Sequence, residues 1–368
     1  MNKDGTTSPQ PTGGGSDPDL ATLAQAGRWL EAGHGVALAT VIETWGSAPR
    51  AIGSHLAVRA DGLFAGSVSG GCVEGDVVAA ATELLAKKEA VRELAFGVPH
   101  ETAWRVGLAC GGRIRILIEN VSRNPAFLAA LLDAARARTA AWRLVALADG
   151  ADAWGSAATA PQGPLAESLP AGELALPPET AAGSRLVTVA DRSFFLRVYE
   201  PARRLVITGA AHIATYLVRF AAELGQQVTV IDPRGAFLDA FRAQLSSGRE
   251  AVTVIEDWPD EALARHPLDA WSALVTLTHD PKIDDVALDA ALASPAFYIG
   301  ALGSRRTHAA RLARLAARGW SEQDLARIHG PVGLAIGAKG PAEIALSILA
   351  EIIATARGRD AGSGRGAA

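Results

Sequence analysis

The chain is poor in cysteine: its 368 residues include only Cys72 and Cys110. A structural disulfide is therefore not expected, and such sparing use of cysteine indicates a reducing compartment. A zinc site built from cysteines would need more thiol ligands at closer spacing. These exclusions leave the two thiols to act as individual groups.

Long apolar runs are also absent. No stretch approaches the roughly 20 apolar residues that span a bilayer. Residues 1–18 are rich in Gly, Ser, Pro, Thr and Asp, and they lack the apolar core of a signal peptide. We therefore predict no membrane span and a cytoplasmic location. The composition of residues 1–18 and 358–368 predicts disordered tails.

An excess of basic charge is the third missing feature. The chain has 35 Lys and Arg against 39 Asp and Glu, a formal net charge of −4, and no basic run that suits a nucleic-acid partner. Hydrophobic residues make up 49% and charged residues 20%, as in an ordinary globular protein. The length predicts two domains.

The second half has the pattern of a parallel α/β sheet. Residues 205–207 form a short apolar run, residues 212–224 carry a helical pattern, and residues 227–231 form a second buried strand. Asp232 follows that strand, where a Rossmann domain binds a ribose hydroxyl. Further strands are predicted at residues 251–255, 272–277 and 296–300, and further helices at residues 236–245, 284–292 and 305–318.

The turn after the first of these strands is a reduced form of the dinucleotide-binding motif. It reads Gly209-Ala210-Ala211-His212, so only the first glycine of G-x-G-x-x-G remains. Ala211 adds a methyl group where the backbone normally approaches a pyrophosphate. A Rossmann domain that binds NAD(P) and one that has lost nucleotide binding both remain open, because the fold alone does not carry function.

Polar residues follow two other strands of this predicted sheet. His279 and Asp280 come after one strand, and Ser304, Arg305 and Arg306 come after another, at the start of a helix. The second group suits an anion, because free backbone N–H groups and guanidinium groups point the same way. A capped loop and a Ser304 helix cap with solvated arginines would explain the same residues. Their shared position at the carboxyl edge of one sheet favours ligand binding.

Cys72 lies in a glycine-rich loop. Gly70 and Gly71 precede it, and a helix is predicted at residues 73–85. A thiol near a helix N-terminus is favoured as the thiolate, although Glu74 opposes this effect. The glycines allow close backbone approach.

Cys110 has a similar setting, because Gly111 follows it and a strand is predicted at residues 113–118. A lone cysteine is more often a small buried hydrophobic residue. Both cysteines of this chain occupy glycine-rich loops at the ends of elements. This placement favours an exposed, functional thiol for at least one of them.

The first half mixes helical and strand patterns. The expected elements are a helix at 19–32, a strand at 36–42, a loop at 43–50, a hairpin at 55–68, a strand at 140–148, a loose hairpin or insertion at 150–183 and a strand at 193–199. We therefore predict an α/β protein. A mixed α+β domain covers residues 19–200, a Rossmann-like parallel-sheet domain covers residues 201–340, and a C-terminal helix covers residues 341–357.

Several of these motifs together form a known pattern. The chain resembles the XdhC/CoxI family, the xanthine dehydrogenase accessory factors. The matching stretches, in the family's order, are Gly46–Arg50, Gly66–Glu74, Cys110–Gly112, Thr278–Asp285, Tyr298–Thr307 and Pro331–Glu351. The family usually has Gly-x-Gly-His at the Rossmann turn, and this chain has Ala211 at the second glycine.

The resemblance implies an accessory protein that binds the molybdenum cofactor. Such proteins protect or sulfurate this molybdopterin cofactor, in its simple or dinucleotide form, and deliver it to a xanthine dehydrogenase-type enzyme. The implied partners are that enzyme and a cysteine desulfurase, and general grounds favour a homodimer. Cys72 and Cys110 would contact molybdenum or sulfur. The other predicted cofactor contacts are Gly70, Gly71, Gly111, Gly209, His212, Asp232, His279, Asp280, Ser304, Arg305 and Arg306.

The leading hypothesis is thus a chaperone without turnover of its own. An NAD(P)-binding oxidoreductase is the main alternative, and it needs an intact phosphate turn and a hydride-transfer site. A thiol enzyme is a third hypothesis, with Cys72 or Cys110 as nucleophile and His212 or His279 as base.

Overall fold

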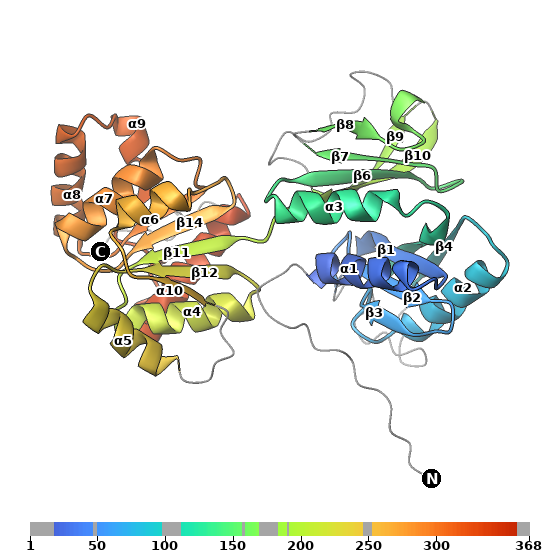
Figure 1. Ribbon diagram of the computed structural model, residues 1–368, viewed down its shortest axis with the longest axis horizontal. Helices are drawn as coiled ribbons and strands as arrows, with labels where there is room; N and C mark the ends of the chain where they lie inside the picture. Colours follow the sequence, from blue (N-terminus) through green and yellow to red (C-terminus); the bar gives the residue numbers. More distant parts are fainter. Residues whose placement is uncertain are drawn as a thin grey trace, which may run out of the picture. The chain divides into compact units, whose positions relative to one another are not determined.

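The computed structural model describes residues 18–46, 50–97, 112–156, 159–168, 183–189, 191–245 and 252–358. The chain forms two compact units: the first ends at Pro201 and the second begins at Ala202. The first unit contains two antiparallel sheets, and the second contains one parallel sheet (Figure 1). The predicted fold class is therefore confirmed. Among these residues, no helix combines the length and the apolar character needed to cross a membrane.

Sheet A of the first unit has the strand order β3-β2-β1-β5-β4 and is antiparallel throughout. Its strands are β1 (Val36–Trp45), β2 (His55–Arg59), β3 (Phe64–Gly66), β4 (Val91–Phe96) and β5 (Arg113–Asn120). The central strand β1 is buried from Val36 to Ile42, because both faces of the sheet are covered. The predicted hairpin is present as β2 and β3.

Strand β1 is longer than its apolar pattern predicts. The residues assigned to a loop from Glu43 onward continue the strand as far as Trp45. A β-bulge between Val41 and Glu43 shifts the register, and the pairing with β5 then continues until Trp45 lies opposite Arg113. The apolar pattern stops at Ile42 because the paired residues beyond it are half-buried or exposed.

Sheet B, also in the first unit, has the order β8-β7-β6-β10-β9 and is antiparallel. Its strands are β6 (Ala141–Ala146), β7 (Asp152–Ser156), β8 (Thr159–Gln162), β9 (Arg185–Val189) and β10 (Arg192–Tyr199). The predicted loose hairpin of residues 150–183 contains the β7–β8 hairpin in its described part. Two short 3-10 helices are η2 (Val121–Arg123) and η3 (Ala166–Ser168).

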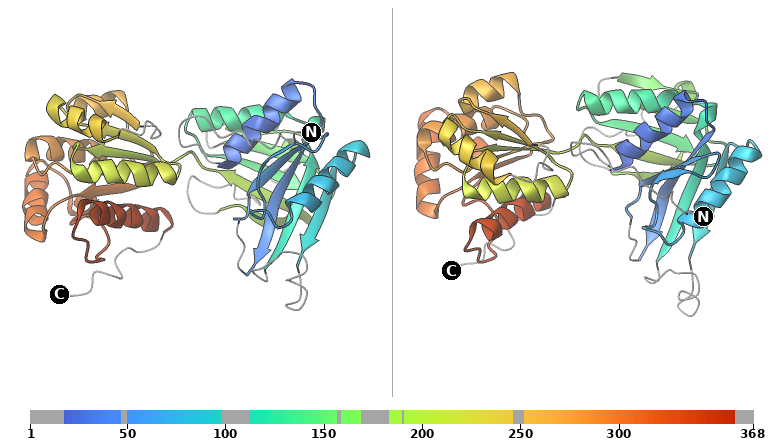
Figure 2. Two further views of the ribbon diagram at one scale, coloured as in Figure 1. Left: turned by 90° about the horizontal axis from the view of Figure 1, so that it is seen from below. Right: turned by 60° about the horizontal axis from the view of Figure 1, so that its bottom comes forward.

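Three helices complete the first unit in the described residues: α1 (Pro18–Glu31), α2 (Glu74–Ala86) and α3 (Ala126–Arg136). Helix α2 covers one face of sheet A with Val77, Ala81 and Leu84 (Figure 2). Helices α1 and α3 lie between the other face of sheet A and sheet B (Figure 1). The Cys72 loop therefore enters α2 on the outer side of sheet A.

The second unit is built on sheet C, with the order β13-β12-β11-β14-β15-β16 and parallel pairing throughout. Its strands are β11 (Arg204–Thr208), β12 (Gln227–Ile231), β13 (Val252–Ile255), β14 (Ser272–Thr276), β15 (Tyr298–Ala301) and β16 (Ile328–His329). Its helices are α4 (His212–Glu223), α5 (Gly235–Gln244), α6 (Pro259–Arg265), α7 (Pro281–Leu292), α8 (Arg305–Ala317), α9 (Glu322–Leu325) and α10 (Pro341–Ala356).

Helices cover both faces of sheet C (Figure 1). Helices α4, α5 and α10 pack on one face, and α6, α7, α8 and α9 pack on the other. The strand order reverses between β11 and β14, the two strands at the centre of sheet C. Ligands of open α/β sheets bind at this switch point.

Candidate functional site

Three segments that are distant in the sequence leave sheet A at the same end. Strand β1 ends at Trp45, β4 ends at Phe96, and β5 begins at Arg113, which pairs with Trp45. Strand β3 runs in the same direction as β1 and ends at Gly66, so the loop to Cys72 leaves sheet A in the direction of this end. Cys110 and Gly111 lie outside the described residues.

The loop before α2 is folded around one carboxylate, that of Glu74. Glu74 accepts hydrogen bonds from the hydroxyl groups of Ser67 (2.8 Å) and Ser69, and from the backbone N–H groups of Val68 (3.2 Å), Ser69 (2.9 Å), Gly70 (3.1 Å) and Gly71 (2.8 Å). Consecutive N–H groups that converge in this way form an anion-binding nest. Here the nest is filled by the chain's own side chain.

Glu74 is ionised at neutral pH. Burial raises the pKa of its carboxyl group, but the hydrogen bonds from Ser69 and Ser67 outweigh this effect and lower the pKa to about 2. Glu74 is also the first residue of α2, where the helix dipole favours a negative charge. The helix end expected to favour a thiolate at Cys72 is thus already neutralised by Glu74.

Cys72 is a free and exposed cysteine. Its backbone N–H donates to the hydroxyl of Ser69 at 3.0 Å. Gly70 and Gly71 adopt φ values of +82° and +119°, which disfavour any residue with a side chain. A Cβ atom at Gly71 would meet no other atom within 4 Å, so the approach to the loop is open. The thiol therefore lies at the surface of a loop whose backbone is fixed.

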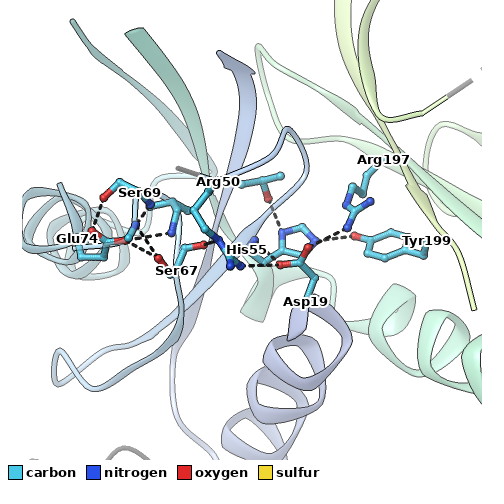
Figure 3. A network of polar contacts seen from close by, with 11 residues as sticks. Asp19, Arg50, His55, Ser67, Ser69, Glu74, Arg197 and Tyr199 are labelled. Carbon is cyan, nitrogen blue, oxygen red and sulfur yellow. Dashed lines mark hydrogen bonds and ion pairs between the residues drawn. The ribbon is translucent and has the colours of Figure 1, made fainter. Parts of the chain in front are cut away.

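A chain of polar contacts connects this loop to the rest of the first unit (Figure 3). The guanidinium of Arg50 donates to the carbonyl of Ser67 at 3.2 Å and lies 3.8 Å from the carboxylate of Asp19. Asp19 also accepts from the backbone N–H of His55 at 2.9 Å and pairs with Arg197 at 3.1 Å. Arg50, which ends the Gly46–Arg50 motif, thus anchors the Cys72 loop to α1 and β10.

His55 is buried at the centre of this network. Its two ring nitrogens lie 3.0 Å from the hydroxyl of Thr40 and 3.0 Å from the hydroxyl of Tyr199. Burial lowers the pKa of His55 well below 6.5, and the positive charges of Arg197 and Arg143 lower it further. His55 is therefore neutral at pH 7 and connects sheet A to sheet B.

In the second unit, the predicted ribose ligand Asp232 is fully buried. One of its carboxylate oxygens accepts from the backbone N–H and Nε of Arg234, and the other accepts from the N–H of Ala210 and Nη2 of Arg234. All four acceptor positions of the carboxylate are thus used. A ribose hydroxyl would have to displace Arg234, so the predicted contact stays a prediction.

The two loops at the switch point are in direct contact. Gly209 has a φ of +105°, and a Cβ atom there would lie 2.6 Å from the side chain of Thr278. His212 is exposed at the start of α4, and His279 is exposed with a φ of +63°. Asp280 caps α7 by accepting from the N–H of Lys282 at 2.9 Å. The structure thus brings these residues of the two predicted motifs to one edge of sheet C.

One strand further along this edge, Ser304 caps α8 by accepting from the N–H of Thr307 at 3.1 Å. Arg305 and Arg306 are exposed in the first turn of α8, and neither makes a hydrogen bond or ion pair to the described residues. The helix cap is therefore present, and the two guanidinium groups stay available to an anion.

The sequence patterns missed a buried cluster around Glu351. This carboxylate accepts from the hydroxyl of Tyr298 and the N–H of Gly333, both at 2.7 Å, and lies 3.3 Å from Nδ1 of His329. The rings of Tyr298 and His329 stack at 4.6 Å. Burial raises the pKa of Glu351, but these hydrogen bonds lower it overall. The sequence signal that could have revealed this cluster is the position of Glu351, a carboxylate on the apolar face of helix α10.

A second buried cluster joins the two sheets of the first unit. The guanidinium of Arg143 lies 2.9 Å from Glu119 and 2.8 Å from Asp152, and all three side chains are buried. It also lies 3.6 Å from the ring centre of Phe127. Burial raises the pKa of Glu119 despite this pairing. No motif predicted this triad, because its members come from three separate strands.

Both units match models of one protein family. Residues 205–352 match the model described as the XdhC Rossmann domain, and residues 29–96 match that described as the XdhC and CoxI family. The chain is 29% identical to the molybdenum cofactor insertion chaperone PaoD of Escherichia coli (strain K12), over 92% of this chain and 88% of that protein. It is 27% identical to a probable xanthine dehydrogenase subunit of Bacillus subtilis (strain 168), over 89% of this chain and 94% of that protein.

The fold has a counterpart among solved structures. A crystal structure described as a xanthine dehydrogenase from Bacillus halodurans superposes with a TM-score of 0.70 at 25% identity. The match covers 94% of this chain and 97% of that chain. The similarity therefore extends over both units.

Proposed function

We propose that this chain, which belongs to the XdhC and CoxI family, is an accessory protein that binds the molybdenum cofactor and delivers it to a xanthine dehydrogenase-type enzyme. The proposal includes protection or sulfuration of the cofactor before delivery. It is supported by the relative named a molybdenum cofactor insertion chaperone, which matches this chain over nearly the full length of both proteins.

The observation that carries the proposal is the exposed thiol of Cys72 on a loop fixed by Glu74. A thiolate is a soft ligand, and soft ligands suit a soft metal or its sulfur ligand. When bound, the cofactor supplies the molybdenum and its terminal sulfur. The chain supplies the thiol, the bare backbone of Gly70 and Gly71 beside it, and the anchor of Arg50 behind it. Cys110 is proposed as a second thiol of the same kind.

The second unit is proposed to carry an anion-binding site of its own at the carboxyl edge of sheet C. Arg305 and Arg306 stand at the N-terminus of α8, where free N–H groups add to the attraction for a phosphate. Gly209, His212, His279 and Asp280 are the further candidate contacts at this edge.

The oxidoreductase alternative gains no support from this arrangement. It needs Asp232 to accept from a ribose hydroxyl, and Arg234 and Ala210 already fill the acceptor positions. It also needs a close approach of a pyrophosphate at Ala211. We therefore propose no nicotinamide chemistry for this chain.

The proposal carries expectations about partners and location. The client is a xanthine dehydrogenase-type enzyme, and a cysteine desulfurase is the proposed source of the sulfur. The accessory protein acts in the cytoplasm, as a homodimer. These statements rest on the proposed function.

Co-purification tests the central claim. The protein is expressed in cells that make molybdenum cofactor, and molybdenum and pterin are measured per chain in the wild type and in Cys72→Ala and Cys110→Ala variants. We expect both to co-purify with the wild type and to be lost with at least one variant. Ser168→Ala, a change of similar size in the same unit, serves as the control. Full occupancy in the double cysteine variant, with its far-UV spectrum unchanged, would show that the thiols do not hold the cofactor.

A further inference from the structure

A hollow of about 430 Å³ opens at the end of sheet A, where β1, β5 and β4 lie side by side. It is lined by Trp45, Ala95, Phe96, Gly97, Arg113, Ile114 and Arg115. We call it the Trp45 hollow. It lies beside the ends of β4 and β5, and Arg113 follows Cys110 by three residues in the sequence.

Trp45 is the unusual feature of this hollow. This residue is 45% exposed although it ends the central strand of sheet A. It pairs across the strands with Arg113, so the two side chains project from the same face of sheet A. A large exposed aromatic side chain beside a hollow can stack against the ring of a bound ligand.

Arg113 is an available cation. Its guanidinium makes no hydrogen bond or ion pair to any residue in the described ranges, whereas the neighbouring Arg115 is held by Glu43 at 2.6 Å and Glu93 at 2.8 Å. The aliphatic part of the Arg113 side chain packs over Gly97: a Cβ atom at Gly97 would lie 2.8 Å from the Cγ atom of Arg113. Gly97 thus provides the space in which this arginine lies beside the hollow.

We propose that the Trp45 hollow binds a planar heteroaromatic ring that carries an anionic group. The ring stacks on Trp45, and the anion pairs with Arg113. The inference rests on the proposed function, in which this ring is the pterin of the molybdenum cofactor. The Cys72 loop leaves sheet A in the direction of the end where the hollow opens. A purine nucleotide shares this chemistry, and the experiment separates the two.

The test uses the full chain and 6-carboxypterin as the probe, with binding followed by fluorescence titration. We expect saturable binding, with Trp45→Ala and Arg113→Ala each weakening the affinity by about tenfold, as for loss of one stacking platform or one charge pair. Trp45→Phe should retain most of the affinity, because a phenyl ring still stacks. Trp258→Ala is the matched control, since Trp258 is 44% exposed in the second unit, and Arg123→Ala is the control for an exposed arginine of the first unit.

The outcomes separate this inference from the proposed function. Absence of 6-carboxypterin binding, or an equal loss of affinity in the control variants, would overturn the proposed ring site even if molybdenum co-purifies with the chain. Adenosine monophosphate bound more tightly than 6-carboxypterin would overturn the pterin assignment. If 6-carboxypterin binding depends on Trp45 and Arg113 but the chain retains no molybdenum, the ring site is supported and the proposed function fails.

Discussion

Substitution of Glu74 by Gln tests the central element of the site. Gln has nearly the same shape, but its amide nitrogen is a donor and faces groups that donate, such as the N–H of Gly71. The pKa of Glu74 is lowered from 4.5 to about 2, and one pKa unit is worth about 1.4 kcal/mol, so the loop stabilises the charged carboxylate by about 3.5 kcal/mol. Solvent at the loop surface screens part of this, which leaves about 2 kcal/mol.

Amide hydrogen exchange measures this effect locally. A loss of about 2 kcal/mol corresponds to about 30-fold faster exchange of the amides of residues 68–71 in Glu74→Gln, if these amides exchange by opening of the loop. The folded pKa is the lower one, so the stabilisation is complete above pH 4.5 and disappears as the pH falls towards 2. The difference between wild type and variant should therefore shrink only in acid.

Glu83→Gln is the matched control for this experiment. Glu83 lies on the same helix and its pKa is also lowered to about 2, but the cause is Lys87 and Arg92 rather than the loop. Exchange at residues 68–71 should be unchanged in this control. If Glu74→Gln leaves these amides within twofold of the wild type at neutral pH, Glu74 does not hold the loop.

Two further predictions concern the first unit. Arg143→Met leaves the buried Glu119 and Asp152 without their counter-charge, so urea unfolding should show that the free energy of unfolding falls by about 3–5 kcal/mol. The control Arg136→Met removes an exposed partner of Asp133 and should change the free energy of unfolding little. Equal stability of the two variants would contradict the role of the triad. His55→Met should remove the contribution of His55 to the loss of stability in acid. The pKa of His55 in the folded chain lies well below 6.5, so only the unfolded chain takes up a proton at this residue as the pH falls below 6.5. The free energy of unfolding of the wild type should therefore drop by about 1.4 kcal/mol per pH unit there. Parallel urea midpoints for wild type and variant between pH 7 and pH 5.5 would rule this out.

The second unit was the more predictable part of the fold. Buried parallel strands are short apolar runs, so β11, β12 and β14 were predicted to within one or two residues. Helix α10 was predicted because Pro341 occupies its first turn and its apolar residues repeat with helical spacing. These local signals agree with the final fold, and no distant contact had to be known.

The first unit was harder to predict. Strand β4 has no counterpart among the predicted elements, because charged Arg92 and Glu93 interrupt its apolar pattern. Helix α3 was also missed, although its own sequence carries a signal: Phe127, Leu128 and Leu131 form its buried face, and Arg136 lies in its last turn. Strand β4, in contrast, is decided by its pairing with β5 rather than by its own periodicity.

The site shows the same division between local and distant causes. The exposure of Cys72 was predicted from its glycine-rich surroundings, which are local. The role of Glu74 was not, because sequence suggested a charge that merely opposes a thiolate. The folding back of four consecutive N–H groups onto one carboxylate depends on backbone angles that spacing does not encode.

The filled nest around Glu74 also affects how the loop meets a ligand. Because the carboxylate acts as a permanent internal counter-ion, the loop has its final shape before any cargo arrives, and little conformational entropy remains to be lost on encounter. The N–H groups that would otherwise bind a free oxyanion such as sulfate or phosphate are already occupied by this carboxylate. The thiol of Cys72 thus lies on a loop whose anion-binding nest is filled before a ligand arrives.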